Sequence, residues 1–173
     1  MFQYEPEKGG PTVESKLAKF QGFLVVDAEH RFNGVFASGR AIEVGCNAHG
    51  RRKFEDAETT QPVLAVEGGR FLAAAFAAEE EARTAGLVGG VLRDWRQAKV
   101  GPLYVQLRHW VHAVEPGLLP DEKLAATIRY YRNHWDALTQ WVERRSCRGT
   151  SGRGWRGTRG RAGCGRRARR RPT

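Results

Sequence analysis

Residues 20–54 read FQGFLVVDAEHRFNGVFASGRAIEVGCNAHGRRKF, and this stretch decides the predicted fold. Residues 23–26 are four consecutive strand-forming residues that follow a glycine and stop at Asp27. Residues 41–44 alternate apolar and polar side chains, as a half-buried strand does. We therefore predict two strands, the first of which presents the Asp27 carboxylate at its C-terminal end.

Working outward, residues 46–54 leave the second strand and open a predicted helix with Arg51, Arg52 and Lys53 in its first turns. These three side chains could contact DNA phosphates, which are the sequence-independent part of DNA affinity. The acids within residues 55–58 favour an alternative, in which the basic residues form a solvated helix face. The sequence favours neither interpretation over the other.

From Pro62 onward the apolar period becomes helical, and two further apolar stripes begin after Pro102 and Pro120. The stripes consist of Leu64, Phe71, Ala75 and Ala78, then Leu103, Leu107, Trp110 and Val114, then Leu124, Ile128, Tyr131, Trp135 and Leu138. This pattern predicts three or four antiparallel helices. Aromatic side chains at helical spacing are predicted to pack in the core and not to stack on bases.

Charge is distributed unevenly along the chain. The formal net charge is +10, but residues 144–173 hold twelve Arg and no acid, so the other 143 residues carry a net −2. A globally basic nucleic-acid-coating protein is therefore excluded. The Arg/Gly-rich segment lacks Leu, Ile and Val, so we predict a disordered tail.

Several other classes are excluded by simple features. The longest apolar run, residues 71–78, is far shorter than the roughly 20 residues of a membrane span. The first residues have neither the basic nor the apolar region of a secretory signal. Because no apolar run is long enough to span a membrane, we predict no membrane partner. The three cysteines suggest no disulfide framework, so we predict a cytoplasmic location.

Two pairs of possible zinc ligands stand out, Cys46 with His49 and His109 with His112. Each pair has ligand-like spacing, but the pairs lie far apart in the sequence, and the second flanks the predicted core residue Trp110. We favour the interpretation without zinc.

Five ordered blocks across residues 2–143 together resemble the insertion sequence 66 family of transposases. The blocks are Phe2-x-Tyr4-x-Pro6-x-Lys8-Gly9; Phe20-x-Gly22-x-Leu24-x-x-Asp27; Glu43-Val44-x-Cys46-x-Ala48-His49-x-Arg51-Arg52-Lys53-Phe54; Arg96-Gln97 with Pro102-Leu103 and Leu107-x-x-Trp110; and Ala126-x-Ile128-Arg129-Tyr130 with Trp135-x-Ala137-Leu138-Thr139. The resemblance implies an RNase H-like core with a helical insertion, DNA as partner, and DNA transposition with Mg²⁺. It also implies that Asp27 is a catalytic and metal-binding residue.

The expected fold class is α+β, mainly α. It comprises a partial RNase H-like sheet of about two strands in residues 1–57, an antiparallel helical insertion in residues 58–143, and the tail in residues 144–173. Because two strands lack further partners, we expect an exposed sheet edge or a marginally stable body.

The departures from the family pattern concern its catalytic residues. The family's aspartate is followed by Gly-Tyr, whereas Ala28 and Glu29 follow Asp27. The family's earlier Asp would precede Met1, and its final Asp-Asn-Asn-x-x-Glu-Arg segment is replaced by residues 144–147. We therefore expect a fragment truncated at the N-terminus and frameshifted after Glu143. It would keep one of three carboxylates and be inactive alone, because one carboxylate cannot place two ions.

Alternatives remain open for the tail and for the function. The tail could be a nucleic-acid-binding extension, a solubilising extension or an out-of-frame translation, and we favour the last because it uses Arg without any Lys. The alternative function is a non-catalytic helical protein that associates with nucleic acid or with an intact transposase through its Arg-rich tail.

Overall fold

The computed structural model describes residues 9–142, and the predicted tail lies outside them. The two predicted strands are present as β1 (Gly22–Val26) and β2 (Ala41–Gly45), paired in parallel with Gly22 opposite Ala41. Parallel pairing places the carboxyl ends of both strands at one edge of the sheet. There the Cys46 amide donates a hydrogen bond of 2.8 Å to the Val26 carbonyl.

Helices make up most of the described chain, so the predicted fold class is confirmed. Their bounds are α1 (Gly10–Lys16), α2 (Asn33–Ala37), α3 (Asn47–Ala57), α4 (Pro62–Thr84), α5 (Gly89–Lys99), α6 (Gly101–Val114), α7 (Lys123–Asn133) and α8 (Trp135–Thr139), with 3₁₀ turns η1 (His30–Phe32) and η2 (Glu115–Gly117). Within residues 9–142 none of the helices is both long and apolar enough to cross a membrane.

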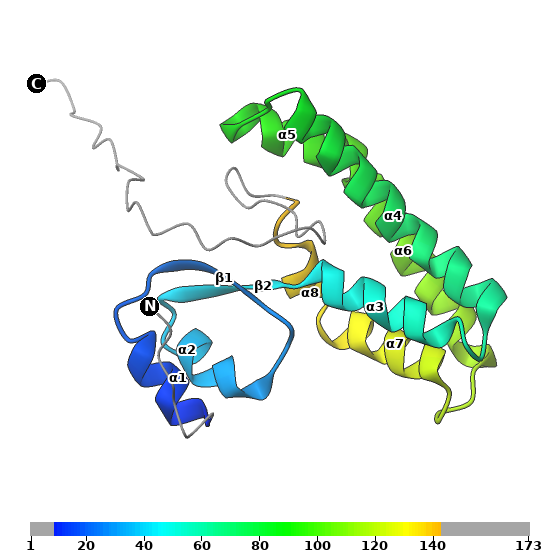
Figure 1. Cartoon of the computed structure of the whole chain (residues 1–173), viewed down its shortest axis with the longest axis horizontal. Helices are drawn as coiled ribbons and strands as arrows, with labels where there is room; N and C mark the ends of the chain where they lie inside the picture. Colours follow the sequence, from blue (N-terminus) through cyan, green and yellow to red (C-terminus); the bar gives the residue numbers. More distant parts are fainter. Residues whose placement is uncertain (1–8, 143–173) are drawn as a thin grey trace, which may run out of the picture.

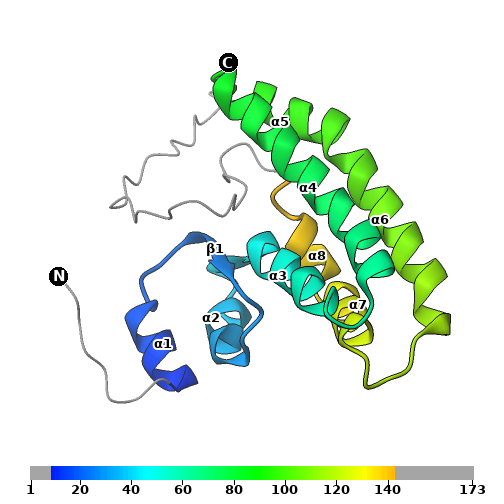
Figure 2. The same cartoon turned by 45° about the vertical axis from the view of Figure 1, so that its right-hand side comes forward.

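The helices form two groups around the sheet (Figure 1). Helices α1 and α2 lie together beside the strands, while α4 and α6 run side by side on the opposite side of the molecule. Helix α3 packs on α4 and α7, and α8 returns to β2. Figure 2 shows that the chain turns after α4 and that α5 and then α6 lie beside α4.

Three local predictions differ from the structure. The sequence of residues 29–40, between the two strands, predicts a polar loop, but the structure has η1 and α2 there, with Val35 buried. The third apolar stripe is two helices, since the backbone leaves the helical conformation at His134. Helix α5 was not identified in the sequence as a helix separate from its neighbours.

One hydrophobic core joins β2 to the helices through Val44 and the buried faces of α3, α4, α6, α7 and α8. The Phe54 ring lies 5.4 Å from the Tyr131 ring and 5.9 Å from the Trp110 ring, so these aromatic residues form part of the core as predicted. A Cβ added at Gly68 of α4 would lie 2.4 Å from Phe54 Cε1. The glycine therefore allows α4 to approach this aromatic group.

A buried ion pair joins α4 to α5. Arg96 of α5, which is fully buried, donates hydrogen bonds of 2.5 and 2.8 Å to the Glu79 carboxylate of α4. It also donates to the Trp141 carbonyl at 3.3 Å and lies over the Trp141 ring. The segment that follows α8 is thereby attached to α4 and α5.

Candidate functional site

Asp27 lies directly after β1, half-buried at the carboxyl edge of the sheet, where the sequence predicted it. The next residue, Ala28, has a φ of 64°, a left-handed conformation that is costly for a residue with a Cβ. Backbone strain of this kind occurs often at functional sites. The chain therefore turns sharply where the candidate carboxylate is presented.

The start of α3 is held beside this edge by a buried polar network. The Asn47 side chain donates a hydrogen bond of 3.0 Å to the Leu138 carbonyl and accepts one of 2.7 Å from the Tyr104 hydroxyl. Trp141 Nε1 in turn donates to the Tyr104 hydroxyl at 3.3 Å. Asn47 thus positions the first turns of α3, a role that no local sequence signal indicates.

The three predicted DNA-binding residues differ in their surroundings. Arg51 Nε donates to Glu55 Oε1 at 2.8 Å, so its charge is partly neutralised within α3. Lys53 Nζ lies 4.9 Å from the centre of the Tyr130 ring, and Arg52 is exposed and makes no ion pair with any residue of 9–142. Of these three residues, Arg52 and Lys53 are therefore the two without a carboxylate partner within residues 9–142.

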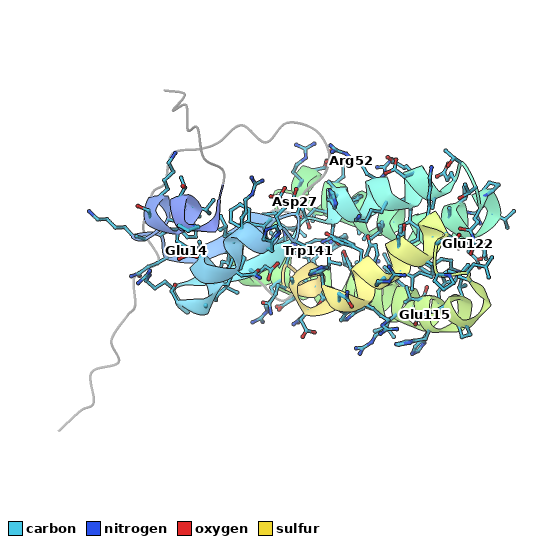
Figure 3. The ribbon with its side chains drawn as sticks, turned by 90° about the horizontal axis from the view of Figure 1, so that it is seen from below. Glu14, Asp27, Arg52, Glu115, Glu122 and Trp141 are labelled. Carbon is cyan, nitrogen blue, oxygen red and sulfur yellow. The ribbon has the colours of Figure 1, made fainter. Side chains whose placement is uncertain are left out.

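His49 links these basic residues to Asp27. Burial lowers the pKa of His49, Lys53 and Arg52 lower it further, and Asp27 opposes them. Asp27 therefore acts electrostatically on the same imidazole as Arg52 and Lys53, which follow His49 on α3. Figure 3 labels Asp27 and Arg52, which lie on the same side of the junction between the sheet and α3.

Tyr130 is a residue of this site that the sequence reasoning missed. Its hydroxyl is buried and has no hydrogen-bond partner within residues 9–142. Burial raises the pKa of Tyr130 well above its ordinary value, and Cys46, Asp27 and Glu43 raise it further. The only signal in the sequence is its place in the last family block, beside the predicted core residue Tyr131.

A model of the family described as "Transposase IS66 family" matches residues 1–151. The chain belongs to this family. The match includes both strands and every described helix, and it extends past Glu143, where the composition changes. Neither the curated proteins nor the solved structures yielded a match to the chain.

Membership of the IS66 family of DDE transposases implies an active site with divalent metal ions. The described residues can be compared with the requirements of such a site. A two-ion centre needs several oxygen ligands gathered at one point. Within residues 9–142 no three His, Cys, Asp or Glu side chains gather closely enough to hold a cation. Asp27 and its described neighbours therefore do not fit a two-metal centre by themselves.

The two possible zinc pairs also stay apart in this IS66 chain. Cys46 and His49 lie at the sheet edge, whereas His109 and His112 line a hollow beside α6. Within the described residues no cluster combines three of these four side chains.

Proposed function

We propose that this IS66 transposase domain binds DNA at the carboxyl edge of its sheet and that Asp27 is its catalytic, metal-binding carboxylate. The observation that supports the proposal is that α3, which bears the exposed Arg52 and the neighbouring Lys53, begins at the strand ends beside Asp27, where the Cys46 amide bonds the Val26 carbonyl. A phosphate bound by these two cations would lie near the Asp27 carboxylate. The remaining metal ligands would have to come from outside residues 9–142.

DNA binding is tested by replacing Arg52 and Lys53, the two basic residues of α3 at this site that have no carboxylate partner within residues 9–142. We expect Arg52→Gln combined with Lys53→Gln to weaken duplex binding and to flatten the salt dependence of log K by about 0.9 for each lost phosphate contact. Arg93→Gln is the matched control, because Arg93 pairs with Asp94 on the distant helix α5. An unchanged affinity and slope in the double variant would refute the proposed interface.

The chain alone is proposed not to cleave DNA. Two ions activate the attacking oxygen and stabilise the leaving oxygen in such reactions, and one carboxylate cannot place both. A supercoiled plasmid incubated with the full chain and Mg²⁺ or Mn²⁺ should stay intact. Nicking that Asp27→Asn abolishes would refute this part of the proposal and would show that a complete centre forms.

The second candidate function is a cytoplasmic, non-catalytic protein that associates with nucleic acid or with an intact transposase. The twelve arginines of residues 144–173 favour it, since they would attract nucleic acid at low salt. The DNA sequence of the gene discriminates between the candidates. If the frameshift proposal is right, the next reading frame after codon 143 encodes Asp-Asn-Asn-x-x-Glu-Arg, and its absence there favours the second candidate.

A further inference from the structure

A hollow of about 580 Å³ lies between α6 and the segment around α8. Its walls come from one face of α6 and from residues 135–142, and they consist of Gly101, Tyr104, Val105, Arg108, His109, His112, Trp135, Thr139 and Val142. Aromatic and aliphatic side chains are combined with one arginine and two histidines, and no carboxylate lines the hollow. The volume is within the range of small-molecule sites.

Arg108 and Trp135 form the charged and aromatic part of this hollow. The Arg108 guanidinium carbon lies 5.5 Å from the centre of the Trp135 ring, and the Tyr104 ring packs against the same indole at 6.0 Å. Arg108 is exposed and has no carboxylate partner within residues 9–142. The Arg108 guanidinium could bind an anionic group of a ligand, and the Trp135 ring could stack on a flat ring of the same ligand.

A second hollow of about 380 Å³ shares Arg108 and Trp135 with the first and extends to Glu43 on β2. Arg132, His134 and a second carboxylate, Asp136, also line it. Glu43 belongs to β2, so this second hollow reaches the sheet. Through the shared Arg108 and Trp135, the two hollows connect one face of α6 with β2.

We propose that the larger hollow binds an unpaired nucleotide of a DNA strand, with the base against Trp135 and Val105 and a phosphate on Arg108. The inference rests on the proposed DNA-binding function and adds a second, strand-specific contact to it. Bases inside a duplex are stacked and paired, so only an overhang or an extruded nucleotide can enter such a hollow. Stacking on aromatic side chains accepts any base, so no sequence preference is expected here.

The test compares a blunt duplex with the same duplex carrying a short single-stranded overhang, using the full chain throughout. We expect the chain to prefer the overhang, and both Arg108→Gln and Val105→Glu to reduce that preference roughly tenfold without changing blunt-duplex affinity. Val105 is 55% exposed, so its replacement should not disturb the fold, which thermal unfolding checks. Val91→Glu on α5, where Val91 is 63% exposed, and Arg129→Gln on α7 are matched controls outside both hollows.

The outcomes separate this inference from the proposed function. Equal losses for blunt and overhang duplexes in Arg108→Gln would make Arg108 a general phosphate contact and overturn the nucleotide site. An overhang preference that both variants retain would assign it to another part of the chain and also overturn the site. Absence of binding to either duplex would overturn both the site and the DNA-binding proposal.

Discussion

Ala28 occupies a left-handed backbone conformation directly after the candidate catalytic residue, at a position where the family pattern has glycine. Glycine adopts this conformation without a steric penalty, whereas alanine pays about 1 kcal/mol. We therefore expect Ala28→Gly to raise the free energy of unfolding by about 1 kcal/mol in denaturant titrations. Ala73→Gly on the exposed side of α4 is the control and should lower it by about 1 kcal/mol. A loss of stability in Ala28→Gly would contradict the assigned conformation.

The three described tyrosines, Tyr104, Tyr130 and Tyr131, predict a specific response to alkaline pH. Burial raises the pKa of each phenol above the ordinary value of 10.0. The unfolded chain loses these protons from about pH 10 while the folded chain keeps them, so their contribution to stability is complete below pH 10 and declines above it. Phenolate absorbance from these residues should appear together with the loss of helical circular dichroism. Ionisation of all three near pH 10 in a fully helical protein would contradict their burial.

At the scale of elements, the buried pair Glu79–Arg96 attaches α4 to α5 and to the segment after α8. Glu79→Ala would leave the Arg96 charge buried and uncompensated, so we expect the free energy of unfolding to fall by about 3 kcal/mol. Combining it with Arg96→Met should recover part of the loss, because the unpaired charge is then removed. Glu80→Ala, which breaks the exposed pair with Arg83, is the control and should change stability little. Equal effects of the two alanine variants would argue against a buried pair.

The adjacent glycines of α4 provide a matched pair for testing helix packing. Alanine is favoured over glycine in a helix by about 0.5–1 kcal/mol, and a Cβ at Gly69 would meet only ordinary contact at 3.7 Å. Gly69→Ala should therefore stabilise the protein. Gly68→Ala should destabilise it by about 1–3 kcal/mol, because its Cβ would overlap the Phe54 and Trp110 rings. Thermal unfolding of both variants measures the difference, and stabilisation by Gly68→Ala would show that α4 does not approach this aromatic group so closely.

At the scale of the whole molecule, charge is separated between a slightly acidic body and a strongly basic C-terminal segment. A chain ending at Cys147 lacks ten of the twelve arginines of residues 144–173. We expect this shortened chain to bind duplex DNA more weakly at low salt and with a shallower salt dependence. Circular dichroism should show that its helices are retained. An unchanged salt slope would assign all phosphate contacts to the body.

Local patterns in the sequence predicted much of this fold. The strand ending at Asp27, the alternating second strand and the helices that begin near Pro62 and Pro102 were all indicated, because backbone preference and apolar period act over a few neighbouring residues. The family resemblance was likewise carried by short blocks, and the family match confirms it. The metal-binding role of Asp27 and the domain boundaries at residues 57 and 143 remain predictions.

Only the tertiary structure decided how these elements meet. It brought the start of α3 to the strand end beside Asp27, where the Cys46 amide bonds the Val26 carbonyl, and fixed Asn47 against Leu138 and Tyr104. It also buried the Tyr130 hydroxyl beside the sheet edge and combined α6 with Trp135 around a basic hollow. These arrangements depend on side chains from distant parts of the chain coming into contact, and nothing in the pattern of neighbouring residues records which of them will meet.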